Sequence, residues 1–580
     1  MDDTNSLIEQ RKAKLAALRA KGIDPFKNKF TPGETCQHAR EHYAEGREVA
    51  LAGRITAHRD MGKSMFLDIR DQSGRMQIYA QKNVLGDEPF AIFQHLDLAD
   101  FIGVRGTMFT TKTSEISVKI TGFVILAKAL RPPPAKWHGL EDTEIRYRQR
   151  YLDLMANPEV KETFLKRSRV IAEIRNFLHS RGFVEVETPM MQAIPGGAAA
   201  QPFKTHHNAL GCDFYMRIAL ELPLKRMLVG GVDKVFEIGR VFRNEGLSRK
   251  HNPEFTMLEA YQAFGDYESM MELVQSMICH VAQNVVHTNR IPRNRHGELR
   301  TELMTVCVKL AVASAMPGAR TLTSPAVREF RESFLKPIGD GFHWESAKTA
   351  LPEAKRLSGL LDQDYQINKD VLGELKSEVE YAAAELKNAI NKITELCTEE
   401  WIDLTPPWRR AKYKDLVREK AGADWFEASP AARRQRAHDL GAEITKDYQD
   451  FEVTGAVFEK LIEPTLIQPT FVTHLPKELV PLAKLSPDDP TTVEVFECCI
   501  NGQEIAPAYT EQNDPIEQRE RLEHQAGGEQ QKLDEDFLVA LEHGMPPAGG
   551  MGMGIDRLCM MLLGQESIRD VILFPQLKPK

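Results

Sequence analysis

The chain has 580 residues, of which 42% are hydrophobic and 27% are charged, and this composition excludes collagen-like, coiled-coil-only and disordered proteins. Its 75 Lys and Arg and 83 Asp and Glu residues give a net charge of −8, which excludes a wholly basic nucleic-acid-binding coat but allows a local basic face. Eight scattered cysteines without a CxxC pair, an acidic start at Met1–Asp3 and the lack of an apolar run of about 20 residues predict a cytoplasmic protein with no membrane partner.

The first predicted element is a basic helix that begins at the capping box Ser6–Glu9 and ends at Gly22. Its basic side chains form either a solvated face that packs on a neighbouring element or a contact with tRNA or another polyanion. These side chains are Arg11, Lys12, Lys14, Arg19 and Lys21.

Short strands recur at even spacing between Val49 and Ala127, with turns and no helices between them. This pattern indicates a small closed barrel or a sandwich, and we favour an OB-fold barrel. OB-folds bind single-stranded nucleic acid by stacking bases on aromatic side chains, and Phe66 and Tyr79 are candidates unless they belong to the core. The predicted strands are Val49–Gly53, Met65–Ile69, Met76–Ala80, Ile102–Gly106, Ile116–Ile120 and Phe123–Leu126.

Changes in pattern divide the rest of the chain. Consecutive prolines after Arg131 predict an extended linker within 131–160, and an amphipathic helix is expected at Arg167–Arg181. Helical pattern dominates 288–400, where an unbroken heptad seam from Leu372 to Leu396 favours antiparallel packing within the block over an intermolecular coiled coil. The expected divisions are 1–130, 131–160, 161–287, 288–400 and 401–580, with the third and fifth forming one domain.

A first group of polar residues surrounds a predicted hairpin. Period-2 alternation places Arg243 and Glu245 on one face of the first strand. Glu259 and Tyr261 likewise share one face of the returning strand. A cation and a carboxylate so placed suit a ligand that carries both a phosphate and hydrogen-bond donors, whereas the alternative is a solvated charged face.

A second hairpin is predicted at Asn501–Gly502, because Asn-Gly between apolar runs favours a two-residue turn. With that turn Cys499 pairs with Glu504, and Glu497 lies diagonally across the ladder from Glu504. Two carboxylates this close repel unless a cation lies between them, and Mg²⁺ completed by phosphate oxygens fits such a pair. The alternative is a structural or incidental pair.

Glycines alternate along Gly550–Gly554, directly before an apolar helix that contains Arg557 in its first turn. Glycine allows a flat ring or a phosphate to approach the backbone closely. The spacing of these glycines and the lack of a βαβ pattern exclude a dinucleotide-binding site. Arg557 near the positive end of the helix dipole favours an anionic ligand.

Together these segments resemble the class II aminoacyl-tRNA synthetases, and the preceding OB barrel is typical of the subgroup that charges lysine, aspartate or asparagine. The longer matches are similar to the lysyl-tRNA synthetase family, although the block 288–400 lies outside its usual pattern. The segments that resemble motifs 1, 2 and 3 are Gly182–Pro189, Phe242–Glu259 and Gly550–Arg557, and the longer matches include Ile194–Ala198, Thr205–Asn208 and Tyr509–Glu511.

The resemblance implies an α+β protein, in which an OB-fold anticodon-binding β-barrel joins a class II catalytic domain with an antiparallel sheet, flanking helices and a helical insertion. It implies an enzyme that attaches L-lysine to tRNA(Lys) through a lysyl-adenylate, with ATP as a substrate, Mg²⁺ as the cofactor and a homodimer built through motif 1. The implied ATP ligands are Arg243, Glu245, His251, Asn252, Phe255, Glu497, Gly554 and Arg557, of which Arg243 and Arg557 are catalytic. The implied metal ligands are Glu497 and Glu504, the lysine ligands are Gly197, Glu221, Glu259, Tyr261, Tyr509 and Glu511, and the anticodon ligands are Phe66, Gln77 and Glu115.

Three rival functions are weighed against this one. An enzyme for aspartate or asparagine needs cations at the side-chain end of the pocket, where this chain offers carboxylates. Synthetase-derived ligases that lysylate a protein or a lipid often lack the barrel. A non-catalytic regulator is disfavoured by the intact Arg243, Glu497, Glu504 and Arg557.

One residue departs from the family pattern. Pro507 stands where the resemblance leads us to expect asparagine, and proline offers neither an amide donor nor a polar side chain. Glu504 and Glu511 are an odd number of residues apart, so a regular strand would face them oppositely. Both line one site only if the strand bulges, and Pro507 is the expected place.

Overall fold

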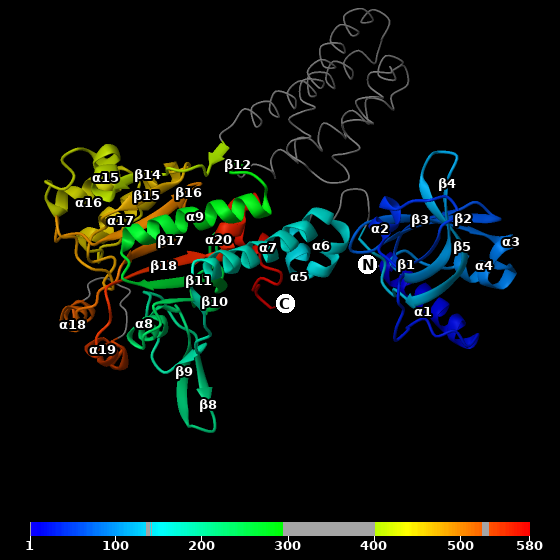
Figure 1. The fold of residues 1–580 in the computed structure, drawn as a ribbon, viewed down its shortest axis with the longest axis horizontal. Helices are drawn as coiled ribbons and strands as arrows, with labels where there is room; N and C mark the ends of the chain where they lie inside the picture. The colour runs from blue at the N-terminus through cyan, green and yellow to red at the C-terminus, as the bar shows by residue number, and fades with distance from the viewer. Residues whose placement is uncertain (1, 135–139, 141, 294–400, 525–532, 580) are drawn as a thin grey trace, which may run out of the picture. The chain divides into compact units, whose positions relative to one another are not determined.

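The computed structural model describes residues 2–134, 140, 142–293, 401–524 and 533–579, which form two compact units, 1–157 and 158–580 (Figure 1). Apart from 288–293, the expected helical block 288–400, including its heptad seam, lies outside the described residues. Over the described ranges, no helix combines the length and the apolar character that crossing a membrane requires.

The first unit contains a closed five-stranded barrel of order β1-β2-β3-β5-β4, as expected for an OB-fold. Buried and half-buried residues alternate along its strands, and the inward side chains form one apolar core. The two strands expected at 116–120 and 123–126 are one strand, because bulges at Thr121 and Leu126 let it bend around the barrel. The strands are β1 Glu48–Asp60, β2 Ser64–Arg70, β3 Arg75–Gln81, β4 Phe101–Thr110 and β5 Ile116–Ala127.

The described residues of this unit form six helices besides the barrel strands. Two of them, at Lys82–Leu85 and Asp87–Gln94, lie between β3 and β4, so the expectation that no helix separates the barrel strands is wrong. The first, α1, begins at Asp2, so the expectation of a helix start at the Ser6 capping box is wrong. Arg11 is buried and donates to the carbonyls of Ala129 (3.1 Å) and Arg131 (2.9 Å), which favours the packing interpretation for this basic side chain. The segment 131–160 expected to be a linker contains two short helices. The helices are α1 Asp2–Ala20, α2 Cys36–Glu41, α3 Lys82–Leu85, α4 Asp87–Gln94, α5 Thr143–Arg148 and α6 Arg150–Ala156.

An eight-stranded sheet of order β14-β15-β16-β17-β18-β11-β10-β6 organises the second unit. Its central pairs are antiparallel as expected, whereas the edge pairs β14–β15 and β10–β6 are parallel. The strands are β6 Val184–Glu185, β10 Lys234–Phe242, β11 Glu254–Ala263, β14 Arg409–Lys412, β15 Thr470–Thr473, β16 Val495–Ile500, β17 Gln503–Thr510 and β18 Ala548–Gly554. A pair β12 Arg290–Pro292 and β13 Trp401–Asp403 and a small sheet of β7 Met191–Gln192, β8 Lys204–His207 and β9 Cys212–Met216 stand apart from it.

Helices cover both faces of this sheet. α7 (Pro158–Ser180), α9 (Tyr267–Val285) and α20 (Ile555–Leu562) share one apolar core with the central strands, and α9 runs across them in Figure 1. α8 (Glu221–Val229) and α19 (Glu535–Glu542) contribute to a separate core with β10 and β11. The remaining helices are α15 Tyr413–Ala421, α16 Pro430–Asp439, α17 Asp450–Leu461, α18 Pro515–Glu523, and the 3-10 turns η3 Glu463–Thr465 and η4 Ile568–Asp570.

The β16–β17 hairpin confirms the predicted turn. Asn501 and Gly502 have φ values of 56° and 69°, the left-handed conformation that a type I′ turn requires. Cys499 pairs with Glu504 as predicted, but Cys498 pairs with Ala506, so Ile505 is the extra residue of a bulge. The bend expected at Pro507 therefore lies two residues earlier, and Pro507 itself pairs with Glu497.

Candidate active site

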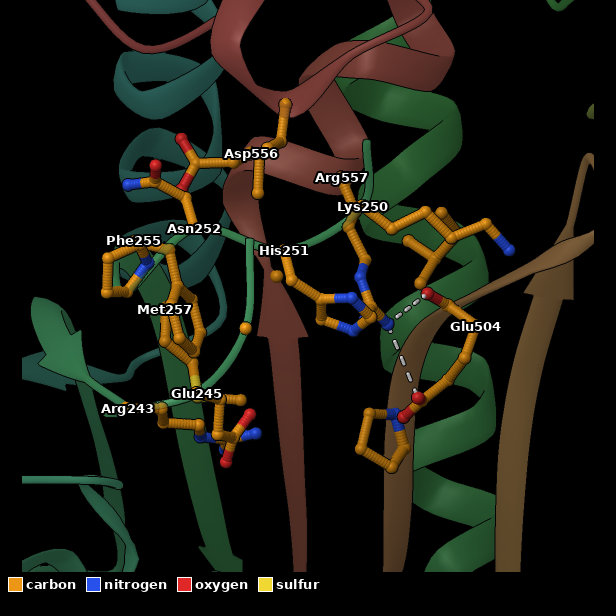
Figure 2. Close-up of a pocket in the computed structure, with 16 residues that line it drawn as sticks. Arg243, Glu245, Lys250, His251, Asn252, Phe255, Met257, Glu504, Asp556 and Arg557 are labelled. Carbon is orange, nitrogen blue, oxygen red and sulfur yellow. Dashed lines mark hydrogen bonds and ion pairs between the residues drawn. The ribbon is translucent and has the colours of Figure 1, made fainter. Parts of the chain in front are cut away.

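Two cavities open on the sheet of the second unit and share part of their walls. The first has a volume of about 210 Å³ and lies between the β10–β11 loop, β17 and the start of α20 (Figure 2). The second, of about 360 Å³, lies over β11, β17 and β18. Both cavities are lined by Arg243, Met257, Glu504 and Pro507.

Arg243 is the cation at the junction of the two cavities. Its Nε donates to the Ile218 carbonyl (3.3 Å), and its guanidinium lies 5.3 Å from the ring centre of Phe255. In the described part of the chain, no carboxylate lies within ion-pair distance of Arg243. The junction therefore presents a fixed guanidinium whose charge is available to an anionic ligand.

Arg557 lies on the opposite side of the first cavity, in the first turn of α20 (Figure 2). Its Nη1 is 3.1 Å from the Glu504 carbonyl and 3.5 Å from Glu504 Oε2, and its Nη2 is 3.2 Å from His251 Nε2. Burial lowers the pKa of His251, and the nearby Arg557 lowers it further, so the neutral imidazole is the form that faces Arg557. Asp556 holds this turn in place by accepting from Arg167 (2.5 Å) and from the Thr256 amide (2.7 Å).

Glu497 and Glu504 are electrostatic neighbours on the β16–β17 hairpin. Burial raises the pKa of Glu497 well above its ordinary value, and the Glu504 carboxylate raises it further. Glu504 lines both cavities, whereas Glu497 lines neither. Among the residues that the structure describes, no three His, Cys, Asp or Glu side chains gather as a complete metal site. A hard cation placed at this carboxylate pair would relieve its repulsion and would draw further oxygen ligands from a substrate.

Glu259 is a buried carboxylate in the wall of the second cavity. Burial raises the pKa of Glu259 to about 8, and the carboxylate of Glu221 adds to this effect. Two neutral donors oppose it: the Leu220 amide and the Tyr261 hydroxyl both lie 2.9 Å from Glu259. Within the described ranges, no cationic side chain forms an ion pair with Glu259, so this carboxylate is available to a cationic ligand.

The other two carboxylates expected in this pocket already share a cation that the sequence analysis missed. Lys225 Nζ lies 2.6 Å from Glu221 Oε1 and 2.5 Å from Glu511 Oε2. Glu221 also accepts from the Tyr509 hydroxyl at 2.5 Å. The Glu-x-x-x-Lys spacing of Glu221 and Lys225 in one helix was the signal for this ion pair.

The alternating glycines Gly550, Gly552 and Gly554 differ in what a side chain at each position would meet. A Cβ atom at Gly550 would lie 2.0 Å from Glu511 Oε1 and 2.4 Å from the Tyr261 ring. At Gly552 and Gly554 it would meet only ordinary contacts, and these two glycines line the second and the first cavity, respectively. Gly550 also lines the second cavity, so all three glycines border a cavity, and at Gly550 the missing Cβ in addition makes room for Glu511 and Tyr261.

The remaining residues expected in the ATP and lysine sites, Glu245, Asn252 and Gly197, differ in their exposure and in their contacts. Glu245 is exposed at the rim of the first cavity. Asn252 is buried, and its Nδ2 donates to the Glu254 carbonyl (2.6 Å) and to Gln576 (2.7 Å), which leaves Oδ1 unpaired. Gly197 lines the second cavity with φ +83°, a left-handed conformation that favours glycine.

In the barrel of the first unit, Phe66 and Tyr79 lie outside the apolar core and stack on each other with ring centres 4.6 Å apart. Gln77 is buried and accepts from the Ser117 hydroxyl at 2.8 Å. Glu115 is half-buried and pairs with Arg75 (2.8 Å) and with Arg40 (3.0 Å). The aromatic pair is thus on the outward face of β2 and β3, where a base could stack.

Comparisons with known proteins agree with this architecture. Residues 142–578 match the family described as tRNA synthetases class II (D, K and N), and residues 49–126 match the OB-fold nucleic acid binding domain. The chain therefore belongs to the class II tRNA synthetases of this family. It is 41% identical to the lysine–tRNA ligase of Moorella thermoacetica over 590 residues, covering 100% of this chain and 99% of that protein. The lysine–tRNA ligases of Pelotomaculum thermopropionicum (42% identical, 100% and 96% covered) and Bacillus subtilis (40%, 100% and 98%) are similar over the same extent.

Proposed function

We propose that this protein attaches L-lysine to tRNA(Lys) at the expense of ATP, releasing AMP and pyrophosphate. The observation that carries the proposal is the pair of joined cavities, in which a free guanidinium, Arg243, adjoins a pocket with the buried carboxylate Glu259. A buried carboxylate attracts the ammonium of lysine and repels aspartate. The test is pyrophosphate exchange with lysine, aspartate and asparagine in parallel, where only lysine should support exchange. Exchange that requires aspartate or asparagine instead would refute the proposal.

The buried cation Lys225 does not favour the aspartate enzyme. Its ammonium is already paired with Glu221 and Glu511, and it does not line the second cavity. Arg243 is the one cation among the described residues that line the second cavity, so the α-carboxylate of a substrate would occupy it, and a second, side-chain carboxylate would be left facing Glu221 and Glu259. The pocket thus suits an amino acid with a cationic side chain.

We assign the nucleotide to the first cavity. Arg243 binds the α-phosphate, Glu245 and Phe255 hold the adenine, and His251 and Arg557 bind the outer phosphates, with Asn252 and Gly554 completing the site. Glu497 does not line this cavity and would act on the nucleotide through a bound Mg²⁺. The amino acid occupies the second cavity, where Glu259 is our first choice for the ε-ammonium and Glu221 for the α-ammonium. Gly197, Tyr261 and Tyr509 complete the lining of this pocket, whereas Glu511, expected among the lysine ligands, lies outside the lining and is paired with Lys225.

Activation needs no general base, because the lysine carboxylate is ionised at neutral pH. One of its oxygens forms a bond to the α-phosphorus while the bond from that phosphorus to the pyrophosphate oxygen breaks, giving lysyl-adenylate. Arg243 and Arg557 stabilise the charge that develops on the phosphate oxygens. The 3′-terminal ribose hydroxyl of the tRNA then attacks the activated carbonyl carbon, and AMP leaves.

We propose that Glu497 and Glu504 hold Mg²⁺, which when bound would neutralise phosphate charge. Glu504→Gln should raise the Mg²⁺ concentration needed for half-maximal exchange by about tenfold, because an amide is a weaker ligand for a hard cation. Mg²⁺ titration of exchange is the measurement, and Glu494→Gln, just before β16 and outside both cavities, is the control. An unchanged Mg²⁺ requirement in Glu504→Gln would mean that the carboxylate pair is structural.

We propose that Phe66, Gln77 and Glu115 contact the anticodon. Phe66→Ala should lower the efficiency of tRNA charging by about 5- to 150-fold, the value of one lost base stack, and should leave lysine-dependent exchange unchanged. Aminoacylation and exchange are measured on the same preparation. The matched control is Phe26→Ala, which removes an exposed aromatic ring of the first unit, whereas Phe66 is half-buried. Equal losses in both assays would place Phe66 in folding rather than in recognition.

We further propose a cytoplasmic homodimer. The segment that resembles motif 1 and its continuation leave Val184, Met190 and Met191 exposed by 52%, 46% and 52%, an apolar surface suited to a second copy. Light scattering should give twice the mass of the 65.6 kDa chain at working concentration. An active monomer under those conditions would contradict this prediction.

A further inference from the structure

A buried lysine of the protein itself, Lys225, lies beside the pocket proposed for the substrate lysine. Lys225 projects from α8 one turn after Glu221 and is fully buried, as is Glu511 on its other side. Burial opposes the charge on Lys225, but the carboxylates of Glu221 and Glu511 outweigh it and raise the pKa of Lys225. The ammonium is therefore charged at neutral pH, and two carboxylates share it.

We propose that Lys225 is a positioning residue that sets the charge of the amino-acid pocket to match that of lysine. This inference rests on the proposed function and concerns specificity within it. Lys225 does not line the cavity, so it acts on the substrate only through the carboxylates that it holds.

A charge count supports this role. Two buried carboxylates, Glu221 and Glu259, line the second cavity, and a third, Glu511, lies outside its lining and contacts Lys225. Lys225 lies between Glu221 and Glu511 and compensates one of the three charges. With lysine bound and Glu259 ionised, the two negative charges that are left equal the two ammonium groups of the substrate, whose carboxylate faces Arg243 in the proposed arrangement. The two other carboxylates of the cavity wall do not enter this count, because Glu504 lies beside Arg557 and Glu478 is exposed.

Lys225 also fixes the direction of Glu221. Its ammonium (2.6 Å) and the Tyr509 hydroxyl (2.5 Å) both contact Oε1 of Glu221. No described residue donates to the other oxygen, Oε2, and Glu221 lines the cavity. One oxygen is thus held by the protein while the other is left for a substrate ammonium, which reduces the ordering that binding must supply.

The test compares Lys225→Met, which removes the charge with little change in volume, with the double variant Lys225→Met/Glu511→Gln, which restores the original charge balance. The single variant should raise the KM for lysine in pyrophosphate exchange by about 30-fold or more, while the KM for ATP changes by less than about threefold. The double variant should recover at least about tenfold of that loss, because a purely structural role of Lys225 would not be restored by removing a second charge.

The control is Arg226→Met, which removes the neighbouring cation of the same helix. Arg226 pairs with Asp534 (2.8 Å) and Asp536 (3.0 Å) outside the pocket, so its replacement should leave the KM for lysine and the KM for ATP unchanged. An unchanged KM for lysine in Lys225→Met, or a double variant no better than the single one, would overturn the proposal. If Lys225→Met is insoluble, the test rests on the double variant. A soluble double variant with lysine-dependent exchange supports the proposal, and a soluble double variant that does not bind lysine contradicts it. Failure of the unmutated protein to exchange with lysine would instead refute the proposed function.

Discussion

Replacing Arg243 with lysine is expected to slow lysine-dependent pyrophosphate exchange by about 10³-fold, with ATP binding changed by less than about threefold. Lysine keeps the positive charge but loses the planar pair of donors that matches two phosphate oxygens. Arg243 borders both cavities, so the bond between the amino acid and the α-phosphate would form beside it. The loss should therefore appear in kcat for exchange rather than in the KM for ATP.

The matched control is Arg240→Lys in β10, which ends one residue before Arg243. Arg240 Nε is 3.6 Å from Glu254 Oε1, and Arg240 lines neither cavity, so its replacement should leave exchange within about twofold of normal. Single-turnover kinetics separate ATP binding from adenylate formation. A near-normal exchange rate in Arg243→Lys would remove this residue from its proposed role.

Replacing Glu259 with glutamine should reduce lysine-dependent exchange by a factor of about 10² or more, because breaking a buried ion pair from one side costs about 3–5 kcal/mol. Glutamine keeps the size of the side chain and can still accept from Leu220 and Tyr261. ATP binding should be nearly unchanged, since the first cavity is intact. The matched control is Glu254→Gln, on the same strand but outside both cavities.

Protonation gives this prediction a second readout. The pKa of Glu259 is raised to about 8 by burial, so below that pH the carboxyl group of the empty pocket carries a proton. An arriving ammonium favours the ionised carboxylate, and lysine binding should therefore release a proton to the buffer. Calorimetry at pH 7 in buffers of different ionisation enthalpy measures this release, which Glu259→Gln should reduce. An undiminished release together with a less than tenfold loss of exchange would move the ε-ammonium to another residue.

Local patterns predicted the parts of the fold that local interactions determine. The Asn501–Gly502 turn and the pairing of Cys499 with Glu504 follow from turn chemistry, and both are present. The bulge at Ile505 could not be placed, because the extra residue is chosen by the packing of β17 between β16 and β18 rather than by its own side chain. The helix start at Asp2 was missed for a related reason, since a capping sequence at Ser6 is only one of several possible starts.

The residues of the candidate site that belong to a sequence motif were predictable, whereas the residue that neutralises the charge of its carboxylates was not. Arg243, Glu259 and Arg557 were singled out from the sequence. In the structure Arg243 and Arg557 line the first cavity, and Arg243 and Glu259 line the second. Lys225 was missed because a lysine in an amphipathic helix is usually a solvated residue. Only the fold reveals that Glu511, far along the chain and directly after β17, approaches Lys225.

The space beside Gly550 has a consequence for which sequences this position can tolerate. Every other amino acid has a Cβ atom, and at Gly550 that atom would lie 2.0 Å from Glu511 Oε1. Single-base changes in the codon thus offer no acceptable neighbour, whereas Gly455 in α17 has nothing within 4 Å of its Cβ position. In a library that randomises each codon in turn, position 455 should drift freely, while position 550 should be retained as glycine for as long as Glu511 and Tyr261 occupy that space.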